Sequence, residues 1–357
     1  MSGTSMDAVD AALCEFLDGR FTGVVDARST HYPDAVRKQL LALQSASGGL
    51  GLGEIADLDQ SVASAFAEAA RPLCEGRHVR AIGSHGQTIF HDATGVRNSL
   101  QLGNPSMIAV KTGVPVVADF RRADMALGGQ GAPLVPAFHH AAFARPDEPR
   151  CVLNIGGISN ITILPDAAND NVRGWDIGPG NALMDEWIEF KQKLSFDAGG
   201  AWAASGSVRE GLLRQLLDDP YFMRPPPKST GRDYFNLAWV RSRFAPMDHF
   251  PGADVQRTLC ELTAQIVSNS VTRHAPRTRL LLVCGGGARN LLLMSRLRDL
   301  QPGMAVEITD DHKLGADRVE AAAFAWLAMR RMDGLTGSLP AVTGARRAAI
   351  LGGIFSP

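Results

Sequence analysis

The sequence lacks a long hydrophobic run. No apolar stretch reaches the ~18 residues that a membrane-spanning helix needs, and the first residues form no basic and hydrophobic leader. We therefore expect a cytoplasmic protein without a membrane partner.

Runs of basic residues and paired cysteines are also missing. The 36 Lys and Arg residues are balanced by 37 Asp and Glu residues, and adjacent basic residues occur only as pairs. Such a chain does not attract a polyanion, so we expect no nucleic-acid binding. The cysteines are odd in number, five, and scattered among apolar neighbours, which is typical of reduced core thiols and not of a disulfide framework or metal site.

Length and composition indicate a globular protein of two domains. The chain has 357 residues, of which 45% are hydrophobic and 20% charged, and single cores stop growing near ~250–300 residues. Residues 145–149 are polar and proline-rich. We therefore expect an N-terminal lobe over residues 1–146 and a C-terminal lobe over residues 147–357.

Asp176 stands out near the middle of the chain. Residues 172–175 resemble the end of a strand, Gly178 and Gly180 permit a sharp turn, and a helical pattern starts after Asn181, a candidate N-cap. This pattern predicts Asp176 at the C-terminal end of a strand beside a helix N-terminus, where open α/β sheets bind ligands. The alternative is a turn residue that accepts local hydrogen bonds.

Three glycine-containing turns adjoin apolar strands. Residues 3–10 open with Gly-Thr-Ser, which suits a phosphate, and Asp7 and Asp10 in this segment are either metal ligands or solvated turn carboxylates. Residues 152–163 repeat this plan as strand, glycine turn and strand. Residues 280–284 form an apolar strand that runs into three glycines, which permit a flat group such as adenine to lie against the backbone, although one glycine suffices for a plain turn.

Polar residues gather at other predicted strand ends. His85 follows a short strand and is either a ligand-binding residue or a hydrogen-bonded core histidine. Arg121 and Arg122 are flanked by aspartates, as in an anion clamp or an internal ion-pair network. Glu320 lies three residues after Asp317, the spacing of a capping box. Residues 225–232 form either a surface connection or a mobile segment that closes over a ligand.

Together these segments resemble the anhydro-N-acetylmuramic acid kinases, a family of the actin, Hsp70 and sugar-kinase superfamily. The resemblance covers nearly the whole chain and follows its order. Its segments are residues 3–7, 84–88, 101–105, 118–122, 128–139, 154–160, 176–181, 227–232, 285–290 and 320–328.

The resemblance implies an α/β fold with two actin-like (ribonuclease H-like) lobes, mixed sheets flanked by helices, and an ATP cleft between the lobes. It implies that Asp176 is the general base and that the sugar contacts are His85, Arg122 and Glu320. Of the two carboxylates in residues 3–10, Asp7 is the candidate metal ligand. The implied ATP-binding residues are Gly3, Thr4, Ser5, Met6, Asp7, Ala8, Val9, Asp10, Asn154, Gly156, Gly157, Ser159, Asn160, Gly285, Gly286, Gly287 and Asn290.

The resemblance also implies a reaction with ATP and Mg²⁺. The family opens the internal bridge of 1,6-anhydro-N-acetylmuramic acid with water and phosphorylates O6, giving N-acetylmuramic acid 6-phosphate in cell-wall recycling. A homodimer is suggested as well. Because the family has an apolar strand before its Gly-Thr-Ser loop, we expect a native start several apolar residues upstream; Ala8 also replaces a usual glycine. Two alternatives stay open: a kinase of another sugar, and an ATP-driven clamp that binds a macromolecule.

Overall fold

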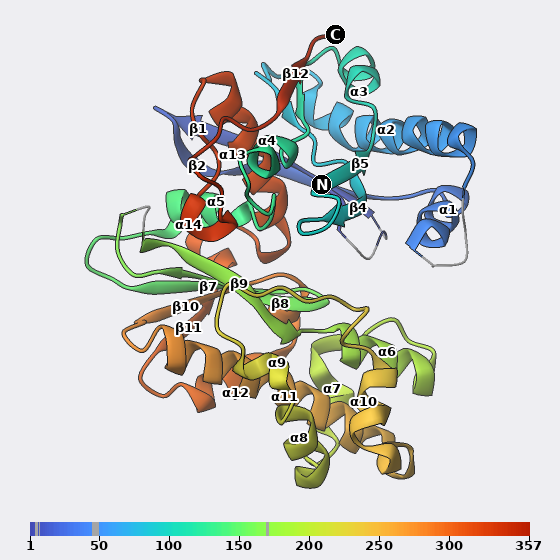
Figure 1. The fold of residues 1–357 in the computed structure, drawn as a ribbon, viewed down its shortest axis with the longest axis vertical. Helices are drawn as coiled ribbons and strands as arrows, with labels where there is room; N and C mark the ends of the chain where they lie inside the picture. Colours follow the sequence, from blue (N-terminus) through green and yellow to red (C-terminus); the bar gives the residue numbers. More distant parts are fainter. Residues whose placement is uncertain (4–5, 7, 45–49, 169–170) are drawn as a thin grey trace. The chain divides into compact units, whose positions relative to one another are not determined.

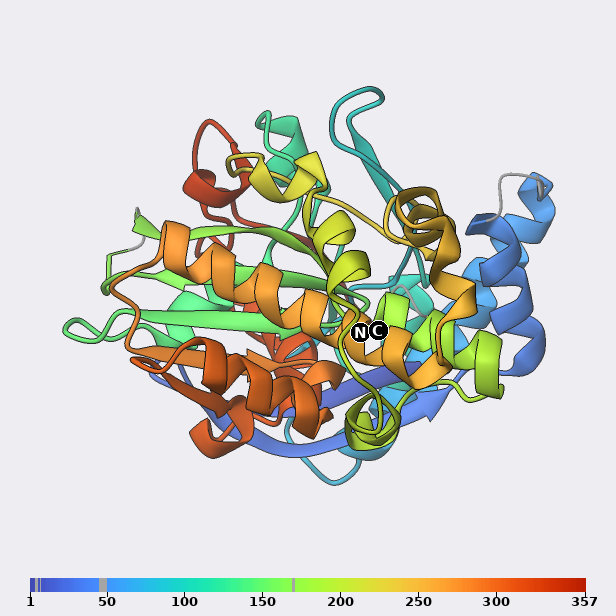
Figure 2. The same cartoon turned by 90° about the horizontal axis from the view of Figure 1, so that it is seen from below.

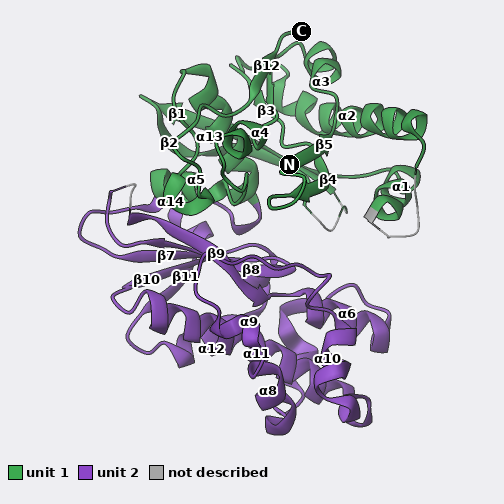
Figure 3. Cartoon of the chain, viewed as in Figure 1, with its two compact units in different colours: residues 1–142, 318–357 green, residues 143–317 purple. Residues whose placement is uncertain are grey.

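Two compact units make up the protein in this computed structural model, which describes residues 1–3, 6, 8–44, 50–168 and 171–357. Unit 1 contains Met1–Ala142 and Arg318–Pro357, and unit 2 contains Phe143–Asp317 (Figure 3). The first crossing between units lies close to the proline-rich segment at 145–149. The chain crosses again at residue 317, so its last forty residues belong to unit 1.

Unit 1 combines short sheets with helices (Figure 1). Its strands are β1 (Ala8–Leu17), β2 (Arg20–His31), β3 (Ile82–Gly83), β4 (Gln87–Asp92), β5 (Asn98–Leu102), β6 (Val116–Ala118) and β12 (Gly353–Phe355). Its helices are α1 (Asp34–Gln44), α2 (Leu52–Cys74), α3 (Pro105–Thr112), α4 (Arg122–Ala126), α13 (Val319–Met332) and α14 (Pro340–Thr343), together with most of α5 (Val135–Phe143). The antiparallel pairs are β1–β2 and β4–β5, and a third sheet has the order β12-β6-β3.

Helical periodicity in the sequence explains how unit 1 forms its core. The apolar positions Leu58, Val62, Phe66 and Leu73 recur at helical spacing on α2 and are all buried. Both α2 and α13 pack on β1, and α13 also packs on β3. The C-terminal segment thus returns to unit 1 because the apolar face of α13 is buried there.

Unit 2 is built on one five-stranded mixed sheet of order β11-β10-β7-β8-β9. Its strands are β7 (Arg150–Ile155), β8 (Ile158–Leu164), β9 (Arg173–Pro179), β10 (Leu280–Cys284) and β11 (Ala305–Ile308). Its helices are α6 (Ala182–Gln192), α7 (Ala201–Ala204), α8 (Glu210–Leu217), α9 (Pro220–Met223), α10 (Leu237–Arg243), α11 (Gly252–His274) and α12 (Leu291–Leu300). Short 3-10 helices span Ala198–Gly200, Ala245–His249, Gly286–Arg289, Thr309–His312 and, at the end of the unit, Ala316–Arg318.

The central strands of unit 2 are buried on both faces. Every residue of β10 is buried, as its uninterrupted apolar sequence predicts. Helices α11 and α12 pack against each other, and α11 crosses one face of the sheet (Figure 2). The prediction of an α/β fold with mixed sheets flanked by helices is confirmed.

Candidate functional site

A two-glycine turn joins β7 to β8 and lies against the start of α6. The carbonyl oxygen of Gly156 accepts a hydrogen bond from the main-chain N–H of Asn181 at 2.8 Å, and that of Gly157 accepts one from Gly180 at 2.9 Å. A Cβ atom on Gly180 would lie 2.4 Å from the Gly156 oxygen, so only glycine fits there. The hairpin and the beginning of α6 therefore form one rigid backbone cluster.

The glycines that follow β10 pack on the end of β7. Gly285 has a φ of 79°, and a Cβ atom there would lie 2.3 Å from Asn154 Oδ1. A Cβ atom on Gly287 would lie 2.3 Å from the Ile155 side chain. Two glycines of the run are thus required by close packing, and the run reaches the same edge of the sheet as the β7–β8 turn.

Asp176 belongs to a row of polar residues across this sheet. It pairs in register with Asn160 of β8, which pairs with Asn154 of β7. Residues directly opposite each other in neighbouring strands place their side chains on the same face. Three separate sequence motifs therefore contribute polar side chains to one face of the unit 2 sheet.

The predicted position of Asp176 at the end of its strand is wrong in one respect. Strand β9 continues past it to Pro179, because Gly178 and Pro179 pair with Ser159 and Ile158 of β8. The register shifts between Ser159 and Asn160, and this bulge accommodates Ile177. Asp176 therefore lies within the strand, three residues before its end.

Burial controls the acidity of Asp176. Removal from water raises the pKa of its carboxyl from 3.8 to about 6, and a hydrogen bond from the main-chain N–H of Thr230 to Oδ2, at 3.1 Å, works in the opposite direction. A carboxylate with a pKa near 6 is ionised at neutral pH and still basic enough to accept a proton.

Two neighbouring polar side chains have different roles. Ser159 is fully buried, and its hydroxyl has no hydrogen-bond partner among the described residues. Asn290 accepts a hydrogen bond from the N–H of Leu293 at 3.1 Å and caps α12, as predicted from the sequence. Asn181 occupies the N-cap position of α6, as predicted, but its side chain makes no capping bond and instead donates to the Ile155 carbonyl at 3.2 Å.

In unit 1, His85 forms a buried cluster with Arg121. The Arg121 guanidinium donates to His85 Nε2 at 2.7 Å and to the Gly131 carbonyl at 2.8 Å. Burial, followed by the charge of Arg121, holds the pKa of His85 well below 6.5, so the ring is neutral. Its Nδ1 atom is buried without a partner among the described residues.

Glu320 adds a carboxyl group to this cluster. Burial raises its pKa, while the positive N-terminus and Arg121 lower it. The capping-box interpretation of Glu320 is wrong, because α13 begins at Val319 without a side-chain cap and Asp317 pairs with Arg289 at 3.0 Å. Glu320 is thus available for the polar cluster.

Arg122 lies at the surface, in contrast to Arg121. Its Nε atom donates to the Ser99 carbonyl at 3.1 Å, and its Nη1 atom lies 3.6 Å from Asp119 Oδ2. Arg122 was predicted as a sugar contact, whereas the more buried Arg121 was not. Two adjacent arginines have the same local pattern, so the only signal that separates them is the distant partner His85.

Residues 3–10 are described only in part. Thr4, Ser5 and Asp7 lie outside the described residues. The side chains of Met6 and Val9 are buried in the core of unit 1, and the Met6 N–H donates to the Gly3 carbonyl at 3.2 Å. Gly3 accepts a hydrogen bond from Gln87 at 3.4 Å, Ala8 begins β1, and Asp10 pairs with Arg318 at 3.5 Å. Within the described ranges, no group of three or more His, Cys, Asp or Glu residues is placed to hold a metal ion.

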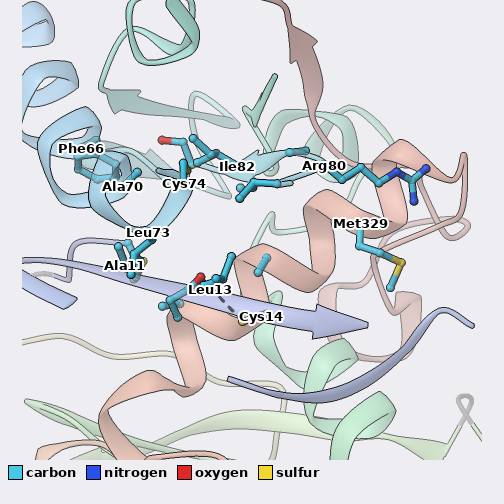
Figure 4. Close-up of a pocket in the computed structure, with 18 of the residues that line it drawn as sticks. Ala11, Leu13, Cys14, Phe66, Ala70, Leu73, Cys74, Arg80, Ile82 and Met329 are labelled. Carbon is cyan, nitrogen blue, oxygen red and sulfur yellow. Dashed lines mark hydrogen bonds between the residues drawn. The ribbon is translucent and has the colours of Figure 1, made fainter. Parts of the chain in front are cut away.

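One cavity in unit 1 is lined mainly by apolar side chains, and Asp10 also lines it. Its volume is about 340 Å³, and it lies between β1 and the segment that leads into β3 (Figure 4). Leu13 of β1, Ile82 of β3 and Phe66 of α2 line it, with Met329 of α13. In the part of the chain described, neither His85 nor Glu320 reaches this cavity, so we assign it no part in the chemistry.

No helix in the described part of the chain combines the length and apolarity needed to cross a membrane.

Comparisons with known proteins agree with the resemblance. The family model described as anhydro-N-acetylmuramic acid kinase matches residues 1–357. The anhydro-N-acetylmuramic acid kinase of Variovorax paradoxus is 49% identical, over 99% of this chain and 97% of the relative. That of Pasteurella multocida is 46% identical, over 99% and 95%. Among solved structures, the activator of the 2-hydroxyisocaproyl-CoA dehydratase from Clostridium difficile with bound ADPNP has a TM-score of 0.45 and 11% identity, covering 92% of each chain. On the family match and the identities of 49% and 46%, the chain belongs to the anhydro-N-acetylmuramic acid kinase family.

Proposed function

We propose that this protein uses ATP to convert 1,6-anhydro-N-acetylmuramic acid and water into N-acetylmuramic acid 6-phosphate and ADP. Besides family membership, one observation in the structure supports the proposal. The Asp176 carboxyl, with its pKa near 6, lies in a polar row at the edge of the sheet where the glycine turns at 156–157 and 285–287 meet. The reaction requires a base that activates water, and glycine turns whose main chain can come close to the phosphates of ATP.

Asp176 acts as general base in the proposed reaction. It accepts a proton from the water whose oxygen bonds to C1 of the sugar, and the bond from C1 to O6 breaks. The freed O6 then bonds to the γ-phosphorus, and ADP leaves. General-base catalysis contributes ~10²–10⁴-fold to such steps. The main-chain N–H groups of the glycine turns offset the phosphate charge, and Mg²⁺ bound with ATP would add positive charge there.

The remaining predicted residues are proposed in two groups. For ATP they are residues 3–10 of unit 1 and, in unit 2, Asn154, Gly156, Gly157, Ser159, Asn160, Gly285, Gly286, Gly287 and Asn290. The unpartnered Ser159 hydroxyl supports this assignment, because a buried polar atom without a partner is costly unless a ligand satisfies it. For the sugar they are His85, Arg122 and Glu320, to which we add Arg121. Binding of Mg²⁺ by Asp7, a cytoplasmic location and a homodimer stay predictions.

Product analysis tests the reaction. The protein is incubated with Mg-ATP and the anhydro sugar in ¹⁸O-labelled water, and the products are examined by mass spectrometry. We expect the sugar 6-phosphate with the label at the anomeric carbon. Turnover of other sugars only would favour the alternative sugar kinase, and ATP hydrolysis without any sugar product would favour the clamp. Label in the transferred phosphate would contradict the role of Asp176.

Substitution tests the base itself. Asp176→Asn is nearly isosteric and keeps an oxygen for the Thr230 hydrogen bond, but it removes the proton acceptor. We expect ring opening and phosphorylation to fall together by at least ~10²-fold while ATP affinity stays nearly unchanged. A purely structural Asp176 would instead show lowered stability and mildly reduced turnover.

A further inference from the structure

One short segment contacts both the backbone and the side chain of Asp176. Tyr221 donates its hydroxyl to the Asp176 carbonyl oxygen at 2.7 Å. The Asp176 N–H donates to the carbonyl of Lys228 at 3.1 Å, and the Thr230 N–H donates to Asp176 Oδ2 at 3.1 Å. Residues 221–230 thus make three hydrogen bonds to a single residue of β9.

Lys228 links the two ends of this segment. Its ammonium group donates to the Tyr221 carbonyl at 3.0 Å and lies 4.6 Å from the centre of the Tyr221 ring. The two ends of the segment, one that holds the Asp176 carbonyl and one that holds its carboxylate, are therefore joined directly. Burial lowers the pKa of Lys228 to about 8, so the contact is made largely by the charged form at neutral pH.

The segment is also anchored to the helices below it. Asp219 is fully buried and accepts hydrogen bonds from the N–H of Tyr221 at 2.8 Å and from Trp239 Nε1 at 2.9 Å. Arg243 pairs with the same carboxylate at 2.5 Å. Trp239 and Arg243 both belong to α10, so that helix fixes the position from which Tyr221 reaches Asp176.

The hydrogen bonds divide the two carboxylate oxygens of Asp176. Oδ2 accepts the hydrogen bond from the Thr230 N–H. Among the described residues no donor is bonded to Oδ1, so this oxygen is open to accept the proton of the water. A fixed orientation of a general base is worth a large rate factor, since misplacement by about 1 Å costs ~10²-fold.

We propose that residues 221–230 form the positioning element of the base, in which Tyr221 fixes the Asp176 backbone and the Thr230 amide orients its carboxylate. The proposal rests on the proposed function, in which Asp176 accepts the proton. It assigns a task in the reaction to part of residues 225–232, for which the sequence permits either a surface connection or a mobile segment that closes over a ligand.

Removal of the Thr230 amide hydrogen is the direct test. Thr230→Pro lacks this donor and Thr230→Ala keeps it. The pH dependence of kcat/KM should show an acidic limb near the pKa of Asp176. We expect this limb to move up by about 1 pH unit in Thr230→Pro, because a hydrogen bond to a charged acceptor is lost, and to stay in place in Thr230→Ala. Equal limbs in the two folded variants would overturn the proposal.

A second pair of variants tests the proposal without proline, in case Thr230→Pro does not fold. Tyr221→Phe removes the hydroxyl that holds the Asp176 carbonyl, and Tyr234→Phe removes a hydroxyl that contacts Asp219 instead. We expect kcat to fall about tenfold in Tyr221→Phe, with the KM for ATP unchanged, and to fall less in Tyr234→Phe, because Asp219 keeps its contacts with Trp239 and Arg243. Equal kcat values in both variants would contradict the role of Tyr221.

An NMR titration of the ¹³C-labelled Asp176 carboxyl separates this inference from the proposed function. The titration requires no turnover, so it measures the effect of the Thr230 hydrogen bond on the Asp176 carboxyl even if the anhydro sugar is not the substrate. The midpoint should rise in Thr230→Pro and not in Thr230→Ala. An unchanged midpoint in Thr230→Pro would overturn the positioning role, whereas a protein inactive on the sugar with a shifted midpoint would overturn only the proposed function.

Discussion

At the scale of single residues, the largely buried carboxyl of Asp176 should make stability depend on pH. Its folded-state pKa, about 6, lies above the unfolded value of 3.8, so the folded protein holds the proton more tightly. The stability that this provides is complete below pH ~4 and is lost as the pH rises through ~6. Asp176→Asn cannot ionise. At pH ~8 we expect it to be more stable than wild type by up to about 3 kcal/mol, less the screening of a partly exposed carboxylate.

Denaturant unfolding at a series of pH values measures this effect. The advantage of Asp176→Asn should shrink between pH ~7 and ~4, as the wild-type carboxyl becomes protonated. Asp147, an exposed aspartate, provides the matched control, because Asp147→Asn should change stability little at any pH. A constant difference between wild type and Asp176→Asn across this range would contradict the raised pKa.

Candidate site residues could be predicted where the local sequence pattern is unusual. Asp176 stands out because a carboxylate followed by Gly178 and Gly180 is a conspicuous local pattern. Arg121 could not be distinguished from Arg122, because the difference between them is burial against His85, 36 positions earlier. Contacts of this length depend on how strands pair, which the local pattern does not contain.

At the scale of elements, the hairpin of β7 and β8 should depend on the glycine that faces it. In Gly180→Ala, the added methyl group would meet the Gly156 oxygen at 2.4 Å and Ser159 Oγ at 2.9 Å. The turn must move, and overpacking of this kind costs about 1–3 kcal/mol. We expect a lower unfolding free energy together with at least tenfold weaker ATP binding, measured by denaturation and calorimetry.

Gly303→Ala is the matched control in the same unit. A Cβ atom at Gly303 has no heavy atom within 4 Å and meets open space. That variant should bind ATP as the wild type does. If Gly180→Ala lost stability but kept full ATP affinity, the hairpin would be structural and not a phosphate loop.

Elements were predictable where one periodicity dominates. The apolar run at 280–284 and the helical spacing on α2 gave β10 and α2 directly. The end of β9 was missed because Gly178 and Pro179 indicate a turn, whereas pairing with β8 keeps them in the strand. A bulge that depends on the partner strand has no signature in the bulged sequence alone.

At the scale of the whole molecule, the return of residues 318–357 to unit 1 was not predictable from composition. The boundary near 145–149 has a local signal in its prolines and charges, whereas the second crossing at residue 317 has none. The second crossing follows from packing: the buried face of α13 contacts β1 and β3, which lie far earlier in the sequence. Long-range packing therefore determines to which unit residues 318–357 belong.

ATP should stabilise the molecule against heat. A ligand that binds only the folded state contributes about 2.7 kcal/mol at 100 times its dissociation constant. In this protein, the glycine turns that would bind the phosphates are brought together only by folding, since 156–157 and 285–287 are far apart in sequence. We therefore expect a rise in Tm of several degrees in saturating Mg-ATP, measured by calorimetry. Tripolyphosphate at equal ionic strength should raise it less, because it lacks the adenosine that the turn at 285–287 would accommodate. An unchanged Tm with ATP would count against a nucleotide site in this chain, and equal shifts with both ligands would reduce that site to a phosphate-binding surface.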